Sequence, residues 1–324
     1  MRSFDFAAAT TVSQALAFAG NGSAYLAGGT TLVDLMKLDV LAPIHVIDIN
    51  GLPLHGVTMA ADGLHIGALT RMSDVAMDPQ VTAAFPVVAQ ALLASASPQL
   101  RNMASIGGNL LQRTRCDYFR DIASPCNKRV PGSGCPAQTG ANRSHAILGS
   151  STSCAATHAS DVAVAFVAMS AVVRLQSQAG QRMLPLADFY VVPGNTPDVE
   201  TVLRSGELIT EVVLPPLRWA TNSSYLKVRD RSSYEFALSS VALAVDQSGS
   251  TIADARIAVG GVATKPWRLP TVEAALRGQP ATVATYQAAA ANAVTDARPL
   301  SENGFKVTLV QRAIVRALVE LVGA

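Results

Sequence analysis

The segment that begins with Ile106-Gly-Gly-Asn109 and ends with Ala159-Ser-Asp161 contains every cysteine of this 324-residue chain. These cysteines are Cys116, Cys126, Cys135 and Cys154. The segment is rich in Arg, Gly, Pro and Ser, and it lacks the apolar periodicity that is typical of helices and strands. A long irregular segment within a compact chain is usually functional or disordered, and clustered cysteines favour function. We therefore predict an irregular insert that carries a site.

The composition is that of a soluble globular protein. Hydrophobic residues make up 49% of the chain and charged residues 15%, and the length allows two or three domains. The net charge of +2 gives no reason to expect a nucleic-acid or anionic-membrane partner. The sequence has no uninterrupted run of about eighteen apolar residues, so we expect no transmembrane helix.

The N-terminal sequence Met1-Arg-Ser-Phe-Asp-Phe6 contains an acidic residue and lacks the apolar run of a secretory signal. We therefore expect a cytoplasmic protein, although the chain could be exported folded to the periplasm alongside a signal-bearing partner. In a reducing compartment, clustered cysteines are more readily metal ligands than disulfides.

The first 52 residues have the pattern of a small β-α-β-α-β unit. Thr11 is a good start residue for a helix, and Gly20 ends the helical pattern. Short apolar runs then read as buried strands, and Gly28-Gly-Thr-Thr31 stands directly before a second helical pattern. The predicted elements are a helix after Thr11, a strand at Ala24–Ala27, a helix at Leu32–Leu38 and a strand at Val46–Ile49.

Beyond residue 52 the patterns indicate a mixed chain of strands and helices. Alternation over residues 54–68 predicts a hairpin. Helices are predicted at about 71–77, 86–94, 161–169, 283–297 and 305–321, and strands at 171–176, 182–186, 207–214, 223–228, 239–247 and 252–260. The pair Pro215-Pro216 ends the strand at 207–214 and suggests a domain boundary there.

Two glycine pairs, in Gly28-Gly-Thr-Thr31 and Gly107-Gly-Asn109, suggest anion binding. A glycine turn before a helix leaves backbone N–H groups free to point at an anion. Each pair alone is most often a plain turn, but two such loops favour a pyrophosphate held from two sides. Neither pair matches the dinucleotide fingerprint G-x-G-x-x-G or the P-loop, so both of those sites are disfavoured.

The four cysteines are separated by nine, eight and eighteen residues. Without a C-x-x-C pair, thioredoxin-like chemistry and common zinc knuckles are disfavoured. Four thiolates could hold structural Zn²⁺ or an iron–sulfur cluster, and unrelated free thiols are the third possibility. Prolines beside Cys126 and Cys135, and the flexible Gly132-Ser-Gly134, favour loops that converge on a bulky cluster.

Basic residues also surround the cysteines, where they would offset the charge of four thiolates. They are Arg113, Arg115, Arg120, Lys128, Arg129 and Arg143, and by themselves they are better explained as an ordinary solvated loop. The histidines of the insert, His145 and His158, lack metal-ligand spacing, so we interpret them as structural, with a supporting role beside the cysteines as the alternative. The chain has no nucleophile elbow, H-E-x-x-H or paired-carboxylate motif, so we predict no catalytic residue.

Several short motifs, taken in order, resemble the FAD-binding medium subunit of the molybdenum hydroxylases, the xanthine dehydrogenase and aldehyde oxidoreductase family. The motifs are Tyr25-Leu-Ala-Gly-Gly-Thr-Thr-Leu32, Ala104-Ser-Ile-Gly-Gly-Asn-Leu110, Ala159-Ser-Asp-Val-Ala163, Gly206-Glu-Leu-Ile-Thr-Glu-Val212 and Tyr225-Leu-Lys-Val-Arg-Asp230. Each motif is weak alone, but together they span nearly the whole chain in the family's order.

The cysteine insert is similar to that of one subfamily. In most family members the Gly-Gly-Asn and Ser-Asp motifs stand close together, whereas here about fifty residues separate them. The sequences Arg115-Cys-Asp-Tyr-Phe-Arg120, Pro125-Cys-Asn-Lys-Arg129 and Pro131-Gly-Ser-Gly-Cys135 resemble the periplasmic bacterial aldehyde oxidoreductase FAD subunits that carry an extra [4Fe–4S] cluster. The resemblance implies that Cys116, Cys126, Cys135 and Cys154 are the cluster ligands.

The resemblance also implies which residues contact FAD. The first glycine loop, namely Tyr25, Leu26, Ala27, Gly28, Gly29, Thr30, Thr31 and Leu32, would wrap the pyrophosphate with backbone N–H groups. Ser105, Gly107, Gly108 and Asn109 would close on the pyrophosphate and adenosine side. Asp161 would bond sugar or ribityl hydroxyls, Ile209 would meet the isoalloxazine edge, and Lys227 would place a cation near the ring. Thr31 stands where some xanthine dehydrogenases have an acid, which weakens the case for NAD as electron acceptor.

The fold that the resemblance implies is α+β with two domains. Residues 1–216 would form a PCMH-like FAD-binding domain with subdomains at about 1–52 and 53–216 and the [4Fe–4S] insert at about 111–158. Residues 217–324 would form a CO dehydrogenase flavoprotein-like domain with a three-stranded antiparallel sheet and helices.

The function implied is that of an FAD- and [4Fe–4S]-binding electron-transfer subunit in a heterotrimeric, molybdenum-dependent aldehyde oxidoreductase. Its partners would be a large subunit with the molybdopterin cofactor and a small subunit with [2Fe–2S] clusters. Electrons would leave to an external acceptor, for which ferredoxin, quinone, oxygen and NAD all stay open.

Other functions fit parts of the sequence. Within the family, the chain could be the flavin subunit of a 4-hydroxybenzoyl-CoA reductase-like or xanthine dehydrogenase-like enzyme. A self-contained flavin oxidase of the vanillyl-alcohol type is disfavoured by the short chain and the lack of a His or Cys context for flavin attachment. A zinc-stapled scaffold protein that binds a nucleotide is the alternative of another class.

Overall fold

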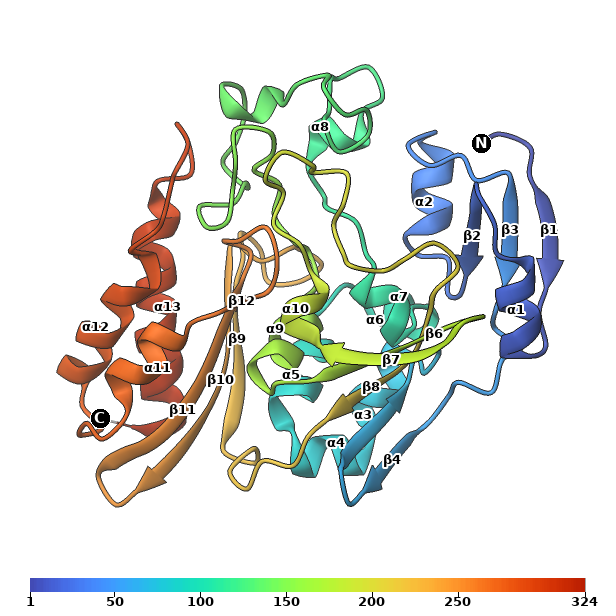
Figure 1. Ribbon diagram of the computed structural model, residues 1–324. Helices are drawn as coiled ribbons and strands as arrows, with labels where there is room; N and C mark the ends of the chain where they lie inside the picture. The colour runs from blue at the N-terminus through green and yellow to red at the C-terminus, as the bar shows by residue number, and fades with distance from the viewer. Residues whose placement is uncertain (324) are drawn as a thin grey trace.

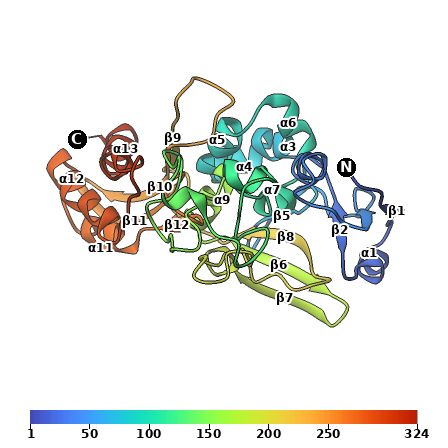
Figure 2. The ribbon, with the colours of Figure 1, turned by 90° about the horizontal axis from the view of Figure 1, so that it is seen from above.

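Three β-sheets, formed by successive parts of the chain, organise the molecule (Figure 1). The computed structural model describes residues 1–323. The N-terminal unit and the C-terminal helices lie at opposite ends, with a five-stranded sheet and its helices between them (Figure 2). The α+β fold expected from the sequence is confirmed.

The N-terminal unit is a three-stranded parallel sheet in the order β1-β3-β2, with both crossovers helical. Its elements are β1 (Asp5–Ala8), α1 (Val12–Phe18), β2 (Ser23–Leu26), α2 (Leu32–Lys37) and β3 (His45–Asp48). Thr11 caps α1, because its hydroxyl accepts a hydrogen bond from the Gln14 N–H. The predicted β-α-β-α-β unit is therefore confirmed.

The central sheet has five strands in the order β4-β5-β8-β6-β7, all antiparallel. Its strands are β4 (Val57–Ala60), β5 (Gly63–Gly67), β6 (Val172–Ser177), β7 (Gly180–Pro185) and β8 (Leu208–Leu214). The predicted hairpin at 54–68 and the paired strands near 171–186 are both present.

Short helices connect β5 to the insert and the insert to β6. They are α3 (Met72–Met77), α4 (Pro79–Ala84), α5 (Pro86–Ala94), α6 (Pro98–Met103), α7 (Ile106–Leu110) and α9 (Asp161–Ala168), while α10 (Leu186–Phe189) follows β7. The predicted helices α3, α5 and α9 are confirmed. Buried α5 and α9 pack against each other in the largest apolar core.

The second glycine pair does not form the loop that we expected. Gly107 and Gly108 lie within α7, whose N-terminus is capped by Ser105 through a bond from the Gly108 N–H at 3.3 Å. A serine cap offsets the weak helix propensity of two glycines. The loop prediction is wrong here, and the pair begins a helix instead.

The C-terminal sheet is antiparallel, in the order β12-β11-β10-β9. Its strands are β9 (Ser223–Val228), β10 (Ser239–Ser248), β11 (Thr251–Gly260) and β12 (Trp267–Arg268). The helices are α11 (Pro270–Leu276), α12 (Val283–Ala291) and α13 (Phe305–Val322), and a 3-10 turn η2 (Asn292–Val294) ends α12. The three predicted strands are present, and the two-residue β12 extends the sheet to four.

Strand β10 is buried on both faces, which joins the C-terminal sheet to the rest of the molecule. Val241, Leu243 and Val245 point into the core formed with the C-terminal helices. Ala242 and Ala244 point to the other side, into the core shared with α5 and α9. The small alanines let these helices approach the sheet closely. Both faces of the sheet are therefore covered by helices.

The insert is mostly irregular, as predicted, and occupies the top of the view in Figure 1. Its regular elements are a turn of helix α8 (Asp117–Arg120) and a 3-10 turn η1 (Pro136–Gln138). Its last part enters the C-terminal core, where Ile147 and Leu148 are buried and both donate backbone hydrogen bonds to the Val262 carbonyl. The insert thus bridges distant parts of the chain.

Candidate functional site

A cavity of about 190 Å³, here called the motif cavity, collects residues from four of the sequence motifs. Thr30 and Thr31 come from the start of α2, and Gly108 and Asn109 come from α7. Asp161 begins α9, and Lys227 belongs to β9. Residues almost 200 positions apart in the sequence therefore meet in one place, as the predicted FAD site requires.

A second cavity of about 420 Å³, the insert cavity, adjoins the first. The two share five lining residues, namely Arg115, Ala159, Asp161, Glu235 and Phe236. The insert cavity runs on to Cys116 and His145 in the insert. The two cavities together therefore extend from α7 to the insert.

The other predicted FAD residues line neither the motif cavity nor the insert cavity. They are Tyr25, Leu26, Ala27, Gly28, Gly29, Leu32, Ser105, Gly107 and Ile209. Ile209 is buried in β8 within the central core, and the Tyr25 hydroxyl is buried without a hydrogen-bond partner among residues 1–323. Their predicted contacts with FAD stay predictions.

The first glycine pair has a packing role. A Cβ on Gly28 would lie 1.9 Å from the Met103 carbonyl oxygen, so only glycine allows the N-terminal unit to approach the end of α6. Gly29 has a φ of +72°, in the left-handed region that glycine adopts without strain. This close approach brings Thr30 and Thr31 beside α7 in the motif cavity.

Asp161 and Lys227, which both line the motif cavity, form a buried ion pair. Their side chains are 7% and 4% exposed, and Lys227 Nζ lies 2.8 Å from Asp161 Oδ2. Asp161 also accepts hydrogen bonds from Ser95 at 3.0 Å and from the Tyr225 hydroxyl at 2.6 Å. Burial, and then the Asp161 charge, raise the pKa of Tyr225 well above its ordinary value. These contacts with Lys227, Ser95 and Tyr225 fix the position of the Asp161 carboxylate.

The two motifs that flank the insert contact each other. The Ser160 hydroxyl donates to Asn109 Oδ1 at 2.5 Å and also caps α9 by accepting from the Ala163 N–H at 3.0 Å. The beginning and the end of the insert are therefore fixed side by side. This contact explains how the fold tolerates about fifty extra residues at this point.

Several residues of the site were not predicted from the sequence as ligand contacts. Among them, Arg115 and Phe236 line both cavities, and Tyr234 lines the motif cavity. Tyr234 and Phe236 belong to the irregular segment between β9 and β10. Arg115 and Arg120 also bind Asp34 of α2, with N–O distances of 2.8 and 2.9 Å. Hydrogen bonds from Arg120 and then Arg115 hold the pKa of Asp34 below its ordinary value. No sequence pattern marks the β9–β10 segment as part of a site.

All four cysteines line one small cavity of about 10 Å³, the cysteine cavity, together with His145. The thiols come from widely separated parts of the insert, so the fold brings them together as predicted. Burial raises the pKa of Cys116 to about 12 and also raises that of Cys154. However, among residues 1–323 no three His, Cys, Asp or Glu side chains are arranged to hold a metal ion.

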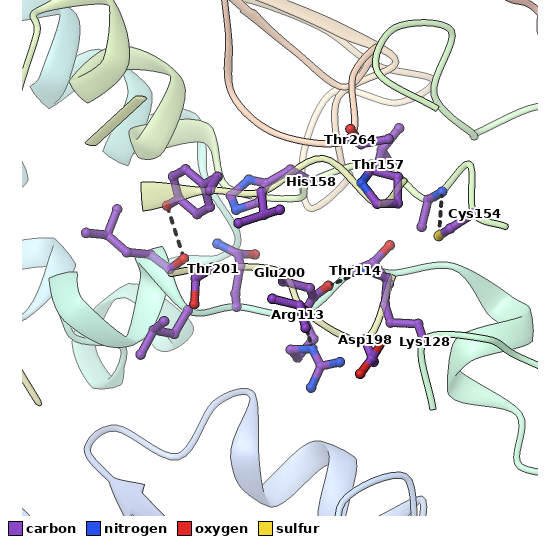
Figure 3. Close-up of a pocket in the computed structure, with 18 residues that line it drawn as sticks. Arg113, Thr114, Lys128, Cys154, Thr157, His158, Asp198, Glu200, Thr201 and Thr264 are labelled. Carbon is purple, nitrogen blue, oxygen red and sulfur yellow. Dashed lines mark hydrogen bonds and ion pairs between the residues drawn. The ribbon is translucent and has the colours of Figure 1, made fainter. Parts of the chain in front are cut away.

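Cys154 also lines a fourth cavity, of about 230 Å³ (Figure 3). Glu200 pairs there with Arg113 and, at 2.8 Å, with Lys128. Burial lowers the pKa of His158 to about 4, so this histidine is neutral. These pairs fasten the insert to the segment that follows α10.

Two family descriptions together match nearly the whole chain. Residues 2–217 match the FAD binding domain in molybdopterin dehydrogenase, and residues 224–321 match the CO dehydrogenase flavoprotein C-terminal domain.

Individual relatives agree with this assignment. The chain is 47% identical to the aldehyde oxidoreductase FAD-binding subunit PaoB of Escherichia coli (strain K12), over 99% of this chain and 98% of that protein. It is 32% identical to the glyceraldehyde dehydrogenase medium chain of Sulfolobus acidocaldarius, over 83% of this chain and 79% of that protein. The solved carbon monoxide dehydrogenase from Hydrogenophaga pseudoflava superposes with a TM-score of 0.78 at 27% identity, covering 99% of this chain and 97% of that one.

The helices among residues 1–323 include none that is both long and apolar enough to cross a membrane.

Proposed function

Because this chain belongs to the FAD-binding medium subunits of the molybdenum hydroxylases, we propose that it is the FAD- and [4Fe–4S]-binding electron-transfer subunit of an aldehyde oxidoreductase. As a member of this family it is a subunit of an oxidoreductase. The observation that carries the proposal is the meeting of four separate motifs in the motif cavity.

The motif cavity suits an FAD molecule that lies between the N-terminal unit and the helices that accompany the central sheet. Thr30 and Thr31 would hold the pyrophosphate, with Gly108 and Asn109 opposite them. Lys227 would place its buried charge near the flavin, with Asp161 fixing the position of that charge. When bound, FAD supplies a ring that exchanges electrons singly or in pairs. The protein's part is to fix that ring and keep its surroundings constant.

We propose that Cys116, Cys126, Cys135 and Cys154 hold the [4Fe–4S] cluster. Four thiols that line one cavity are the usual ligand set of such a cluster. A cluster stands between its thiolates, so its ligands need not meet at one point as those of a single ion do. Lys128 is nearly buried beside the thiols and would partly offset their negative charge.

The partners proposed are those that the aldehyde oxidoreductase family implies. A large subunit with the molybdopterin cofactor would oxidise the aldehyde, and a small subunit with [2Fe–2S] clusters would pass electrons to this chain. The high identity to a bacterial aldehyde oxidoreductase subunit supports an aldehyde as substrate. Residues 1–216 and 217–324 are proposed as the two domains, with the motif cavity formed by residues of both.

Purified protein tests the proposal through its absorbance spectrum and its iron, zinc and flavin contents. We expect flavin bands together with broad iron–sulfur absorbance, and about four Fe per chain. Flavin without iron would contradict the proposed cluster and would still agree with an FAD-binding subunit. A colourless protein that contains zinc would contradict both parts and favour a zinc-stapled scaffold.

Co-purification tests the partners separately. A tagged copy expressed with its neighbouring reading frames should bring down a molybdenum-containing large subunit and a [2Fe–2S] small subunit. If the tagged chain were to purify alone from a host that makes all the neighbouring proteins, the proposed complex would be wrong.

A further inference from the structure

His145 lies directly against a cysteine of the insert. Its Nε2 atom is 3.3 Å from the Cys116 sulfur, and the residue is only 4% exposed. The other ring nitrogen, Nδ1, is buried without a hydrogen-bond partner. The Cys116 sulfur is therefore the ring's only hydrogen-bond partner among residues 1–323.

This geometry determines which ring nitrogen should carry the hydrogen. A neutral imidazole has a single N–H, on either Nδ1 or Nε2. A hydrogen on Nδ1 would be a buried donor without an acceptor, which is costly. A hydrogen on Nε2 points to the sulfur, which accepts it when Cys116 is a thiolate. A metal-bound Cys116 would thus receive a hydrogen bond from His145.

The backbone at His145 is held by two residues at and just before the start of α13. Lys306 is fully buried, and its Nζ donates to the carbonyls of Ser144 at 2.8 Å, His145 at 3.1 Å and Gly261 at 2.7 Å. Asn303 Nδ2 adds a bond to the His145 carbonyl at 3.2 Å. The C-terminal domain therefore sets the place of the imidazole beside the thiol.

We propose that His145 donates a hydrogen bond to the sulfur of Cys116 and raises the reduction potential of the iron–sulfur cluster, with Lys306 and Asn303 as positioning residues. The inference rests on the proposed cluster. Reduction adds negative charge to a cluster and to its sulfurs. A fixed N–H donor stabilises the more negative state, so hydrogen bonds to sulfur are a main control of cluster potentials.

The test compares two replacements of His145 in the purified holoprotein. His145→Phe keeps a flat ring of similar volume but has no donor, whereas His145→Gln can place an amide N–H near the former Nε2. The midpoint potential of the cluster would be measured by a redox titration followed by electron paramagnetic resonance, with iron content measured in parallel. His45→Phe, at the exposed first residue of β3, serves as the matched control.

We expect His145→Phe to keep its iron and to shift the reduction equilibrium about tenfold toward the oxidised form, ~59 mV for one electron. His145→Gln should recover most of this shift, and His45→Phe should show none. If His145→Phe loses iron, His145→Asn replaces it, because its shorter amide does not reach the sulfur and should also lower the potential.

Two results would separate the possible failures. Iron-loaded His145→Phe, or its Asn substitute, with the wild-type potential would overturn the role of His145 and leave the cluster in place. Wild-type protein without iron would instead overturn the cluster itself, and with it the inference.

Discussion

Asp161 and Lys227 form the buried ion pair of the motif cavity. Lys227→Met should cost about 3 kcal/mol of the free energy of unfolding, because it leaves a buried carboxylate without its cation. Urea unfolding measures this cost, and Lys37→Met on the exposed face of α2 is the control, with an expected change below about 0.5 kcal/mol. The double variant Asp161→Asn with Lys227→Met should regain part of the loss. A double variant no more stable than Lys227→Met would contradict the pairing.

Loss of one cysteine should prevent binding of the proposed cluster without preventing binding of FAD. Cys135→Ser is expected to lose iron and keep most of its FAD, because the motif cavity contains no cysteine. Iron and flavin contents of the purified variant decide the matter, with Thr152→Ser, an exposed change in the same insert, as control. Loss of both cofactors together would show that the insert also builds the flavin pocket.

The residues of the site were predictable where they belong to one of the sequence motifs that line the motif cavity. Thr31, Asp161 and Lys227 meet there as expected. Phe236 could not be predicted, since it lies on an irregular segment whose path depends on packing against distant parts of the chain. Ile209 lies in a buried strand away from the motif cavity, and its predicted role depends on a backbone contact that its sequence does not encode.

At the scale of elements, α2 is tied to the insert through Asp34. The pKa of this carboxyl is lowered in the folded state, so the arginine bonds stabilise the fold above the carboxyl's ordinary pKa near 3.8. That stabilisation should disappear as the pH falls through the lower, folded value. Wild-type protein should therefore exceed Asp34→Asn in stability at neutral pH, and the difference should shrink below about pH 4. Urea unfolding at several pH values measures it, and a difference that does not depend on pH would contradict the ion pair.

Helices with a clear apolar pattern were predictable, and the short helix α4 was not. Residues 86–94 and 161–168 have enough apolar residues to reveal their helices. Helix α4 has only six residues and depends on the cap from Asp78 and on Pro79 at its first position. Such a helix is marginal alone and owes its stability to tertiary packing. The sequence Asp78-Pro79 nevertheless indicates the start of a helix, although the apolar residues after it do not add a clear helical pattern.

At the scale of the whole molecule, Lys306 joins the insert to the C-terminal domain. Burial lowers its pKa from 10.5 to about 7, so the unfolded chain binds the proton more tightly than the folded one. Between those two values the lysine's contribution to the free energy of unfolding should therefore rise with pH. Wild-type protein should gain stability relative to Lys306→Met from pH 7 to pH 9 in urea unfolding. A constant difference would mean that the buried amine does not titrate in this range.

The general architecture followed from the order of motifs and strands, whereas the course of the insert did not. Ile147 and Leu148 are ordinary apolar residues in an irregular sequence, and nothing local assigns them to the C-terminal core. Their burial depends on contacts with Val262, more than a hundred residues later. Pairings at such a distance are decided by the packing of the complete chain.

The contacts of Asn303 and Lys306 with the insert have a consequence for folding. The residues that they hold, Ser144 and His145, lie about 160 positions earlier in the sequence. Contacts between such distant parts of a chain form slowly, because a large loop must close first. The segment that carries His145 should therefore reach its final position late in folding, after the local helices and hairpins have formed.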